Sequence, residues 1–469
     1  MKLLFAASEA VPYYKTGGLA DVARALPDAL HERGLDVRII LPAYRTVASV
    51  PGSIEHEADL VVPWPDAPLA ARCRLHRPGA ALAPAVLVEQ PAFFDTAQPY
   101  AESPDPRAVA RRFAFFSRAV VTYAARWGAD VVHLNDWQTG LAALYAQVDG
   151  WDGGTVFAIH NLPYQGNFPA SVLPAIGVPE AYFRTENGIE FFGRVSFMKA
   201  GLAFADRLVT VSPTYAREIQ SPEFGAGLDG MLRFRRRALH GILNGIDPAH
   251  WDPATDENIP ARFDAGTIAR KEENRVALLR ELGLADGGPV LVMVTRLAHQ
   301  KGIDLVLGAM PRLLELGVRV VLLGDGGPEY VAGFRHWAEQ APDRVACRFR
   351  FDEGFARRLY AGGDFFLMPS LYEPCGLGQM IAQRYGTVPV ARRTGGLNDT
   401  IIDERTGYLF DAARSDALAD AVARAAAVWR SRGWTPLRRR CMGVDRSWRR
   451  SARQYQELYR LAAGRLPGQ

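Results

Sequence analysis

A lysine and two glycines near the start of the chain have the residue types and spacing of a phosphate-binding loop. Lys15 precedes Gly17 and Gly18, and a helix-like stretch runs from Ala20 to Arg33. Backbone N–H groups can approach an anion closely at paired glycines before a helix, and the lysine adds positive charge. The lysine of a Walker A loop follows its glycines, so these residues do not form that motif. A glycine turn with a solvated lysine is the alternative interpretation.

Two further cations stand five residues apart in the second half of the chain. Arg296 and Lys301 follow an apolar run, and together they could bind a diphosphate and stabilise a departing nucleotide without a metal. The sequence has no Asp-x-Asp motif, and its four cysteines lack the spacing of a metal site, so we expect no metal. A solvated pair of cations on a loop is the alternative.

Residues suited to binding a sugar stand after other apolar runs. His160 adjoins amide and aromatic side chains, and Trp137 and Tyr164 could supply stacking faces. Glu373 precedes Pro374 and a glycine-containing helix start, which places a carboxylate beside backbone N–H donors. Each of these residues also has a structural explanation, as a buried histidine, as core aromatics or as a capping carboxylate.

The elements that must position these residues are short, uninterrupted apolar runs with helix-like segments between them. Such runs are typical of strands buried on both faces of a parallel sheet. Ligands bind outside the carboxyl ends of such strands, and the polar clusters of both halves stand there, which predicts one cleft between two facing doubly wound domains. The runs are Leu3–Ala7, Val37–Leu41, Ala85–Val88, Val131–Leu134, Val156–Ile159 and Leu208–Val211, and then Val290–Val294, Val318–Leu323, Val345–Phe351, Phe365–Met368 and Val388–Ala391.

Composition excludes several classes of protein. The 469 residues are 48% hydrophobic and 23% charged, as in ordinary globular proteins, so disordered, collagenous and disulfide-stapled classes are excluded. The net charge is +4, but residues 430–469 hold eleven arginines against Asp445 and Glu457. Nucleic-acid binding is one interpretation of this segment; an amphipathic packing helix from Ser447 is the one we favour. The apolar start is too short for a signal peptide, so we expect a cytoplasmic protein without membrane contact.

The order of the motifs closely resembles that of bacterial glycogen synthases, and plant starch synthases share it. The resemblance extends from Met1 to about residue 460. It implies an α/β GT-B fold, with Rossmann-like doubly wound domains over residues 1–243 and 244–446 facing across a cleft, and a helix in residues 447–469 that crosses back to the first domain. The motifs are Lys15–Asp21, His160-Asn161, Val211–Tyr215, Asn244–Asp247, Arg296 with Lys301-Gly302, Glu373–Leu377 and Thr394–Gly396.

The resemblance also implies an activity and a set of site residues. It implies retaining transfer of glucose from ADP-glucose to the non-reducing 4-OH end of an α-1,4-glucan such as glycogen, with no metal and no cofactor. Lys15, Arg296 and Lys301 would bind the diphosphate, and Glu373 and His160 would complete the catalytic set. The other donor-binding residues would be Gly17, Gly18, Asp21, Asn244, Phe351, Cys375, Gly376 and Leu377, and the acceptor-binding residues would be Asp136, Trp137 and Tyr164.

Three positions depart from the family's pattern. Gly378 stands where members often have threonine, Phe351 where some have tyrosine near the adenine, and Pro163 where alanine is commoner. None of them changes the diphosphate cations, although the first two could alter donor affinity. The alternatives that remain are a related GT-B enzyme that uses UDP-glucose or another acceptor, and a non-catalytic glucan-binding relative. We find no lysine motif of a phosphorylase that uses pyridoxal phosphate.

Overall fold

The apolar runs of the sequence form two separate parallel sheets, one in each of two structural units. The computed structural model describes residues 1–45, 47, 50, 52–79, 82–100 and 105–464. Unit 1 consists of Met1–Asn244 and the segment that begins at Trp448, and unit 2 of Gly245–Ser447. The domain boundaries expected from the sequence each lie one residue from these.

The sheet of unit 1 is parallel over most of its width. Its strand order is β12-β11-β7-β6-β1-β2-β5-β4-β3, and strands β12 to β5 run parallel. Strands β6 and β7 are buried along their whole length, as uninterrupted apolar runs predict. The parallel strands are β1 (Lys2–Ala6), β2 (Asp36–Pro42), β5 (Ala85–Glu89), β6 (Val131–Asn135), β7 (Gly154–Ile159), β11 (Arg207–Thr210) and β12 (Leu239–Gly241).

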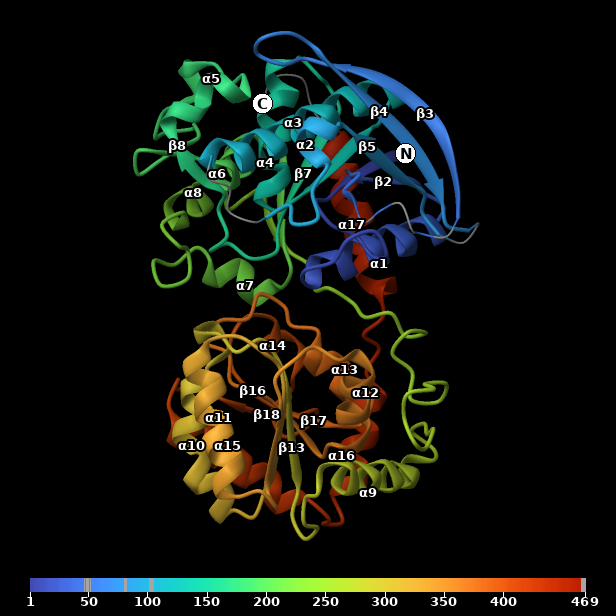
Figure 1. The fold of residues 1–469 in the computed structure, drawn as a ribbon, viewed down its shortest axis with the longest axis vertical. Helices are drawn as coiled ribbons and strands as arrows, with labels where there is room; N and C mark the ends of the chain where they lie inside the picture. The colour runs from blue at the N-terminus through green and yellow to red at the C-terminus, as the bar shows by residue number, and fades with distance from the viewer. Residues whose placement is uncertain (46, 48–49, 51, 80–81, 101–104, 465–469) are drawn as a thin grey trace. The chain divides into compact units, whose positions relative to one another are not determined.

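An antiparallel hairpin, which is not among the strands predicted from the apolar runs, extends this sheet at one edge. Strands β3 (Ser53–Val62) and β4 (Leu69–Arg77) pair with each other, and β4 pairs antiparallel with β5. Figure 1 shows the pair as a long curved ribbon. Buried and exposed residues alternate in the second half of β3, because only one face of the hairpin meets the core. A second, small sheet contains β8 (Asn167–Pro169), β10 (Arg194–Ser196) and β9 (Glu190–Phe191).

The helices of unit 1 begin and end where the local sequence favours it. In α3 the Asp105 carboxylate accepts a hydrogen bond from the Arg107 N–H, Pro106 is the first residue, and Gly128 ends the helix at φ 72°. The helices of this unit, apart from one C-terminal helix, are α1 (Gly18–Glu32), α2 (Pro91–Phe94), α3 (Pro106–Trp127), α4 (Trp137–Val148), α5 (Leu173–Ile176), α6 (Phe197–Phe204), α7 (Pro213–Glu218) and α8 (Asp229–Phe234), with short 3-10 turns at Ala170–Val172 and Glu180–Tyr182.

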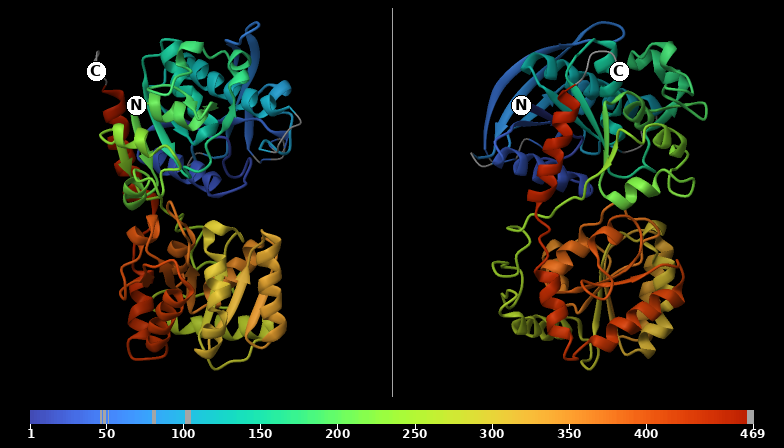
Figure 2. Two further views of the ribbon diagram at one scale, coloured as in Figure 1. Left: turned by 90° about the vertical axis from the view of Figure 1, so that its left-hand side faces the viewer. Right: turned by 180° about the vertical axis from the view of Figure 1, so that it is seen from behind.

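The C-terminal helix α17 (Trp448–Ala463) packs into the core of unit 1. It contacts α1, β6, β7 and β11, and Figure 2 shows it in red beside the sheet. The Tyr459 hydroxyl lies 2.8 Å from Nδ1 of the buried His133, and the Arg33 guanidinium donates to the Gln456 amide oxygen at 2.8 Å. Its buried face is Trp448, Ser451, Ala452, Tyr455, Leu458, Tyr459 and Ala462. Within the basic terminal segment, Trp448–Ala463 therefore form an amphipathic packing helix, as the spacing of the apolar residues predicted.

Unit 2 has a parallel sheet covered by helices on both faces. Its order is β15-β14-β13-β16-β17-β18, with strands β13 (Val290–Val294), β14 (Arg319–Leu323), β15 (Val345–Arg348), β16 (Phe365–Met368), β17 (Val388–Arg392) and β18 (Tyr408–Phe410). On one face lie α10 (Ile303–Glu315), α11 (Pro328–Gln340) and α15 (Ser415–Val428); on the other lie α9 (Lys271–Leu282), α12 (Glu353–Gly362), α13 (Gly378–Arg384) and α16 (Trp434–Met442) (Figure 1). Shorter elements are α14 (Gly395–Thr400) and the 3-10 turns Ile268–Arg270 and His299–Lys301.

Candidate active site

The predicted site residues follow the carboxyl ends of neighbouring strands. In unit 1, Lys15 comes after β1, Asp136 directly after β6 and His160 directly after β7, and these three strands are adjacent in the sheet. In unit 2, Arg296 comes after β13 and Glu373 after β16, and these two strands are paired. Carboxyl ends of parallel strands meet at one edge of a sheet, where open α/β sheets bind their ligands. Each unit therefore gathers its polar residues at a ligand-binding edge.

The glycine loop before α1 is held by a buried carboxylate that the sequence analysis did not single out. Glu9 Oε2 accepts hydrogen bonds from the Thr16 N–H at 2.8 Å and the Thr16 hydroxyl at 2.6 Å. Burial raises the pKa of Glu9, while hydrogen bonds from Thr16 and from the Gly17 and Ala20 N–H groups lower it. Glu9 thus fixes the loop at the N-terminus of α1.

Lys15 lies at the surface of this loop with a partner one helical turn into α1. Its Nζ is 2.6 Å from Asp21 Oδ1, and both side chains are more than a third exposed. Gly17 and Gly18 are exposed. Because the N-cap residue of α1 is Gly17, no side chain at that position caps the helix. The structure therefore brings Lys15, Gly17, Gly18 and Asp21 together at one helix N-terminus.

A chain of hydrogen bonds fixes the protonation of His160. Asn135 donates through Nδ2 to the Ala6 carbonyl at 2.8 Å, so its Oδ1 is the acceptor that lies 2.8 Å from His160 Nε2. The hydrogen of the imidazole is therefore on Nε2. Burial lowers the pKa of His160 to about 4, so at neutral pH its Nδ1 is a hydrogen-bond acceptor.

Asp136 supports the loop that begins at His160 (the His160 loop) from a strained backbone position. Its Oδ1 accepts the His160 N–H at 2.7 Å, and burial raises its pKa to about 7. Its φ is 54°, a left-handed value that is uncommon outside glycine. Because its carboxylate is turned to backbone N–H groups of the His160 loop, Asp136 acts in this structure as a positioning residue for His160.

Trp137 and Tyr164, the two aromatic acceptor candidates, are placed differently. Trp137 packs against Phe113, Phe168 and Phe197, with ring centroids 5.1 to 6.4 Å apart. A Cβ on Gly166 would come within 2.3 Å of the Trp137 ring, so the His160 loop rests directly on the indole. Tyr164, in contrast, is 52% exposed and offers a free face.

Asn244, a donor candidate, ends unit 1. It is only 7% exposed, and its Oδ1 is buried without a hydrogen-bond partner among the described residues. A buried amide oxygen without a partner is costly in a folded protein.

In unit 2, a lysine and a glutamate from neighbouring strand ends form the centre of the candidate site. Lys301 Nζ lies 2.6 Å from Glu373 Oε2, and the same oxygen accepts from the buried Ser370 hydroxyl at 2.8 Å. The Lys301 and Glu373 side chains are 17% and 8% exposed. The Arg296 side chain is exposed and forms no ion pair within the described part of the chain. One cation is thus fixed by a buried carboxylate, and a second stays open to an anion.

Two glycines bring the Glu373 segment into close contact with the segment after β17. The Gly396 N–H donates to the Glu373 carbonyl at 3.0 Å, and a Cβ on Gly395 would lie 1.8 Å from that oxygen. A Cβ on Gly396 would lie 2.2 Å from the Cys375 carbonyl oxygen. Only glycine allows this approach, which fixes the backbone of residues 373–377, including Gly376 at φ 73° and the Leu377 position before α13.

Both units match known protein families. Residues 2–234 match the family described as "Starch synthase catalytic domain", and residues 275–433 match "Glycosyl transferases group 1". A "Glycogen synthase" of Anaeromyxobacter dehalogenans is 49% identical, over 99% of this chain and all of that protein. The chain belongs to the glycogen and starch synthase family. The resemblance seen in the motifs is therefore confirmed.

Solved structures of related proteins agree with this family. The catalytic domain of starch synthase IV from Arabidopsis thaliana, solved with ADP and acarbose, has a TM-score of 0.88 and 34% identity, over 99% of both chains. A sucrose-phosphate synthase from Thermosynechococcus elongatus, with a TM-score of 0.62 and 20% identity over 98% of both chains, shares the fold. The predicted GT-B fold class, α/β with two Rossmann-like units, is confirmed.

The structure gives a physical reason for one departure from the family's pattern. A Cβ on Gly378 would lie 2.9 Å from two ring atoms of the buried Phe366, so a threonine there would require that ring to move. Phe351 is 75% exposed, so its ring is free to stack on a ligand. The structure offers no physical account of the proline at position 163.

Two general findings bear on ligands and membranes. In the described part of the chain, no group of three or more His, Cys, Asp or Glu side chains could hold a metal ion. No helix among the described residues is both long and apolar enough to cross a bilayer.

Proposed function

We propose that the protein transfers glucose from ADP-glucose to the non-reducing 4-OH end of an α-1,4-glucan, with retention of configuration and without a metal ion. The observation that carries the proposal is the set of cations at the carboxyl ends of β1 and β13. Lys301 is fixed by Glu373, while Arg296 and Lys15 are exposed, as a leaving-group diphosphate requires. The names of the relatives, and the ADP in the starch synthase IV structure, support this donor and acceptor.

We assign Glu373 to electrostatic catalysis and not to a covalent intermediate. Its Oε2 accepts hydrogen bonds from both Lys301 and Ser370, which suits a carboxylate that orients this lysine. We therefore assign Glu373 to sugar hydroxyls and to orienting Lys301. The acceptor hydroxyl would attack the anomeric carbon on the face from which the diphosphate leaves, as the bond from that carbon to the diphosphate oxygen breaks, and would pass its proton to the departing oxygen. Lys15, Arg296 and Lys301 would stabilise the negative charge that develops on the diphosphate.

The His160 loop would contribute two acceptors to the sugar. Since the imidazole is neutral with its hydrogen on Nε2, Nδ1 can accept a hydrogen bond from a sugar hydroxyl. The His160 backbone carbonyl can stabilise positive charge at the anomeric carbon. Asn244 Oδ1 would accept from another hydroxyl, which would satisfy that buried oxygen. We expect this activity in the cytoplasm, without nucleic acid or membrane contact.

A nucleotide-release assay tests the proposal. The full-length protein is mixed with ADP-glucose or UDP-glucose, with and without glycogen, in the presence of EDTA, and released nucleoside diphosphate is measured. We expect glycogen-dependent release from ADP-glucose that EDTA does not abolish. Faster release from UDP-glucose would favour the related UDP-glucose enzyme. Failure to release either nucleotide would favour the non-catalytic relative.

A further inference from the structure

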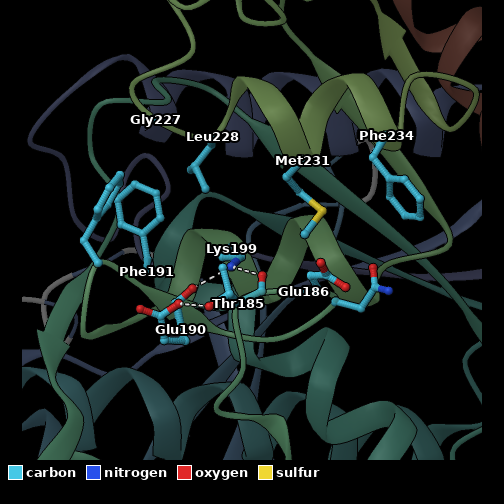
Figure 3. Close-up of a pocket in the computed structure, with 11 residues that line it drawn as sticks. Thr185, Glu186, Glu190, Phe191, Lys199, Gly227, Leu228, Met231 and Phe234 are labelled. Atoms are coloured by element: carbon cyan, nitrogen blue, oxygen red, sulfur yellow. Dashed lines mark hydrogen bonds between the residues drawn. The ribbon is translucent and has the colours of Figure 1, made fainter.

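Unit 1 contains a pocket of about 660 Å³ that shares no residue with the candidate active site. It lies between helix α8 and the segment of residues 185–192, as Figure 3 shows. Met231 of α8 and Leu228, the residue before this helix, project into it, and Thr185, Glu186 and Glu190 line the opposite side (Figure 3). Its volume is within the usual range for small-molecule sites.

Two phenylalanines of this pocket are exposed to solvent. Phe192 is 82% exposed and Phe234 is 71% exposed. Figure 3 places Phe234 at one end of the pocket and Phe191 at the other, and the rings of Phe191 and Phe192 are in contact at 4.7 Å between centroids. Leaving a phenylalanine in water instead of in a core forgoes roughly 1.5–3 kcal/mol, so two of them at one pocket indicate a role in binding.

The backbone of the pocket is strained at the same place. Phe192 has φ 49° and Asn187 has φ 50°, left-handed values for residues that carry a Cβ. For a bulky residue such as Phe192 this conformation is a clear outlier, and it costs on the order of 1–3 kcal/mol. Phe192 and Gly193, at φ 75°, form the two-residue turn between β9 and β10, and such a turn favours positive φ at both positions. The hairpin therefore holds Phe192 in this conformation and presents its ring to solvent, and folding stability does not explain a phenylalanine at this exposed position.

A buried lysine holds the segment of residues 185–192 in its conformation. The Lys199 ammonium donates to the Thr185 carbonyl at 2.6 Å and to the Glu190 carbonyl at 2.5 Å (Figure 3). The Glu190 carboxylate accepts from the Gly193 N–H at 2.6 Å and from the Thr185 hydroxyl at 2.8 Å. The loop is therefore preorganised, and Lys199 is the only cation among the described residues that line the pocket, with its charge directed at backbone oxygens.

The polar groups left to a ligand are mainly acceptors. The Gly193 N–H and the Thr185 hydroxyl lower the pKa of Glu190, so its carboxylate is ionised at neutral pH. The Glu186 and Asn187 side chains are exposed and have no hydrogen bond or ion pair with other described residues. Acidic side chains repel phosphates and nucleotides but accept hydrogen bonds from hydroxyl groups.

We propose that this pocket binds a segment of an α-glucan chain at a distance from the reacting atoms. The faces of a pyranose ring carry C–H groups that pack on aromatic rings, and its hydroxyls donate to carboxylates and amide oxygens. Phe192 and Phe234 supply the rings, and Glu186, Asn187 and Glu190 supply the acceptors. The inference rests on the proposed function insofar as that function makes a glucan the acceptor.

The pocket is linked to the loop that carries His160. The Gln165 amide donates at 2.8 Å to the carbonyl of Ala226, which precedes the pocket residue Gly227. A polymer held here would stay attached to unit 1 between transfers, which raises the local concentration of chain ends. The expected consequence is a lower KM for glycogen and little change in kcat.

Glycogen retention without any sugar nucleotide tests the proposal independently of catalysis. Mobility of the full-length protein is measured in native gels with increasing glycogen. Phe192→Gly removes the ring at a left-handed position that glycine tolerates, so we expect an unchanged or higher Tm and about 10-fold weaker retention. Phe234→Ala should weaken retention similarly. Val61→Ala, at a 71% exposed position on β3 outside the pocket, is the matched control and should leave retention unchanged.

The outcomes separate this inference from the proposed function. Wild-type glycogen retention by Phe192→Gly and Phe234→Ala, with normal Tm, would overturn the inference. If these variants also had a changed sedimentation coefficient, the pocket would instead be assigned to contact with a second copy of the chain. If the wild type releases no nucleotide from either donor and these variants still lose glycogen retention, the glucan pocket stands while the proposed transferase function fails. In an active enzyme, we expect the loss as a KM for glycogen about 10-fold higher.

Discussion

At the scale of single residues, Glu373 is the carboxylate whose surroundings most directly predict an effect on catalysis. Its Oε2 accepts from both Lys301 and Ser370. Glu373→Gln keeps the shape and one acceptor oxygen but removes the charge that orients Lys301. We expect kcat to fall by about 10³-fold, as for loss of a preorganised electrostatic contact, with the fold retained.

The measurement for Glu373→Gln is glycogen-dependent nucleotide release, with circular dichroism as the check on folding. Glu315→Gln, at a 64% exposed carboxylate of the same unit, is the matched control and should retain wild-type turnover. Wild-type turnover by Glu373→Gln would show that the buried Lys301–Glu373 pair is structural.

Asp136 and His160 should make opposite contributions to stability as pH changes. The pKa of Asp136 in the folded protein is about 7, raised from 3.8. Its contribution to the free energy of unfolding is therefore full below pH 4 and is lost as pH rises to 7. His160 has a folded pKa of about 4, lowered from 6.5, so its contribution is present above pH 6.5 and is lost as pH falls to 4. The two slopes oppose each other, and the wild type should therefore show a weak net dependence over this range.

Asp136→Asn should reveal the pH dependence of stability that comes from His160, which Asp136 cancels in the wild type. The amide keeps an acceptor for the His160 N–H but cannot ionise, so only the His160 contribution remains. We expect the free energy of unfolding of this variant, relative to wild type, to rise by several kcal/mol between pH 4 and 7. Urea unfolding at intervals of one pH unit measures it, and the exposed Asp152→Asn variant controls for loss of a carboxyl group. A difference that is constant with pH would contradict the assignment.

At the scale of elements, the sequence predicts best what is buried on both faces. All eleven apolar runs coincide with strands, because a strand covered on two sides needs apolar residues at every position. The hairpin β3–β4 was missed because it is covered on one side only, which mixes polar and apolar residues. The ion pair between Lys301 and Glu373 could not be predicted from the sequence either. It depends on the pairing of β13 with β16, which are far apart in the chain. Glu9 had no local signal, because its partner Thr16 is seven residues away in a loop.

A buried polar pair, His133 and Tyr459, joins helix α17 to β6. Burial lowers the pKa of His133 well below its usual value and raises that of Tyr459, so the pair is neutral. Tyr459→Phe would leave His133 Nδ1 buried and unpaired, which costs about 1–3 kcal/mol in the free energy of unfolding. Chemical unfolding measures the loss. Gln454→Ala, on the exposed face of the same helix, should change stability little; an equal loss in both variants would contradict a specific role of the pair.

At the scale of the whole molecule, the proposed donor residues belong to both structural units. Lys15 and Asp21 are in unit 1, while Arg296, Lys301 and Glu373 are in unit 2. A single bound nucleotide that contacts both sets must stabilise both against local opening. At an ADP concentration about 100-fold above its Kd this amounts to roughly 2.7 kcal/mol, or about 100-fold slower amide exchange where opening breaks the contact.

Hydrogen exchange with and without ADP therefore tests whether the nucleotide contacts both sets of residues. We expect slower exchange in peptides covering residues 15–21 and in those covering 296–301 and 373–377. The hairpin of residues 53–77 carries no proposed donor residue and should exchange at the same rate in both conditions, which makes it the internal control. Protection confined to unit 2 would remove Lys15 and Asp21 from the donor site, and diphosphate stabilisation would then rest on Arg296 and Lys301 alone.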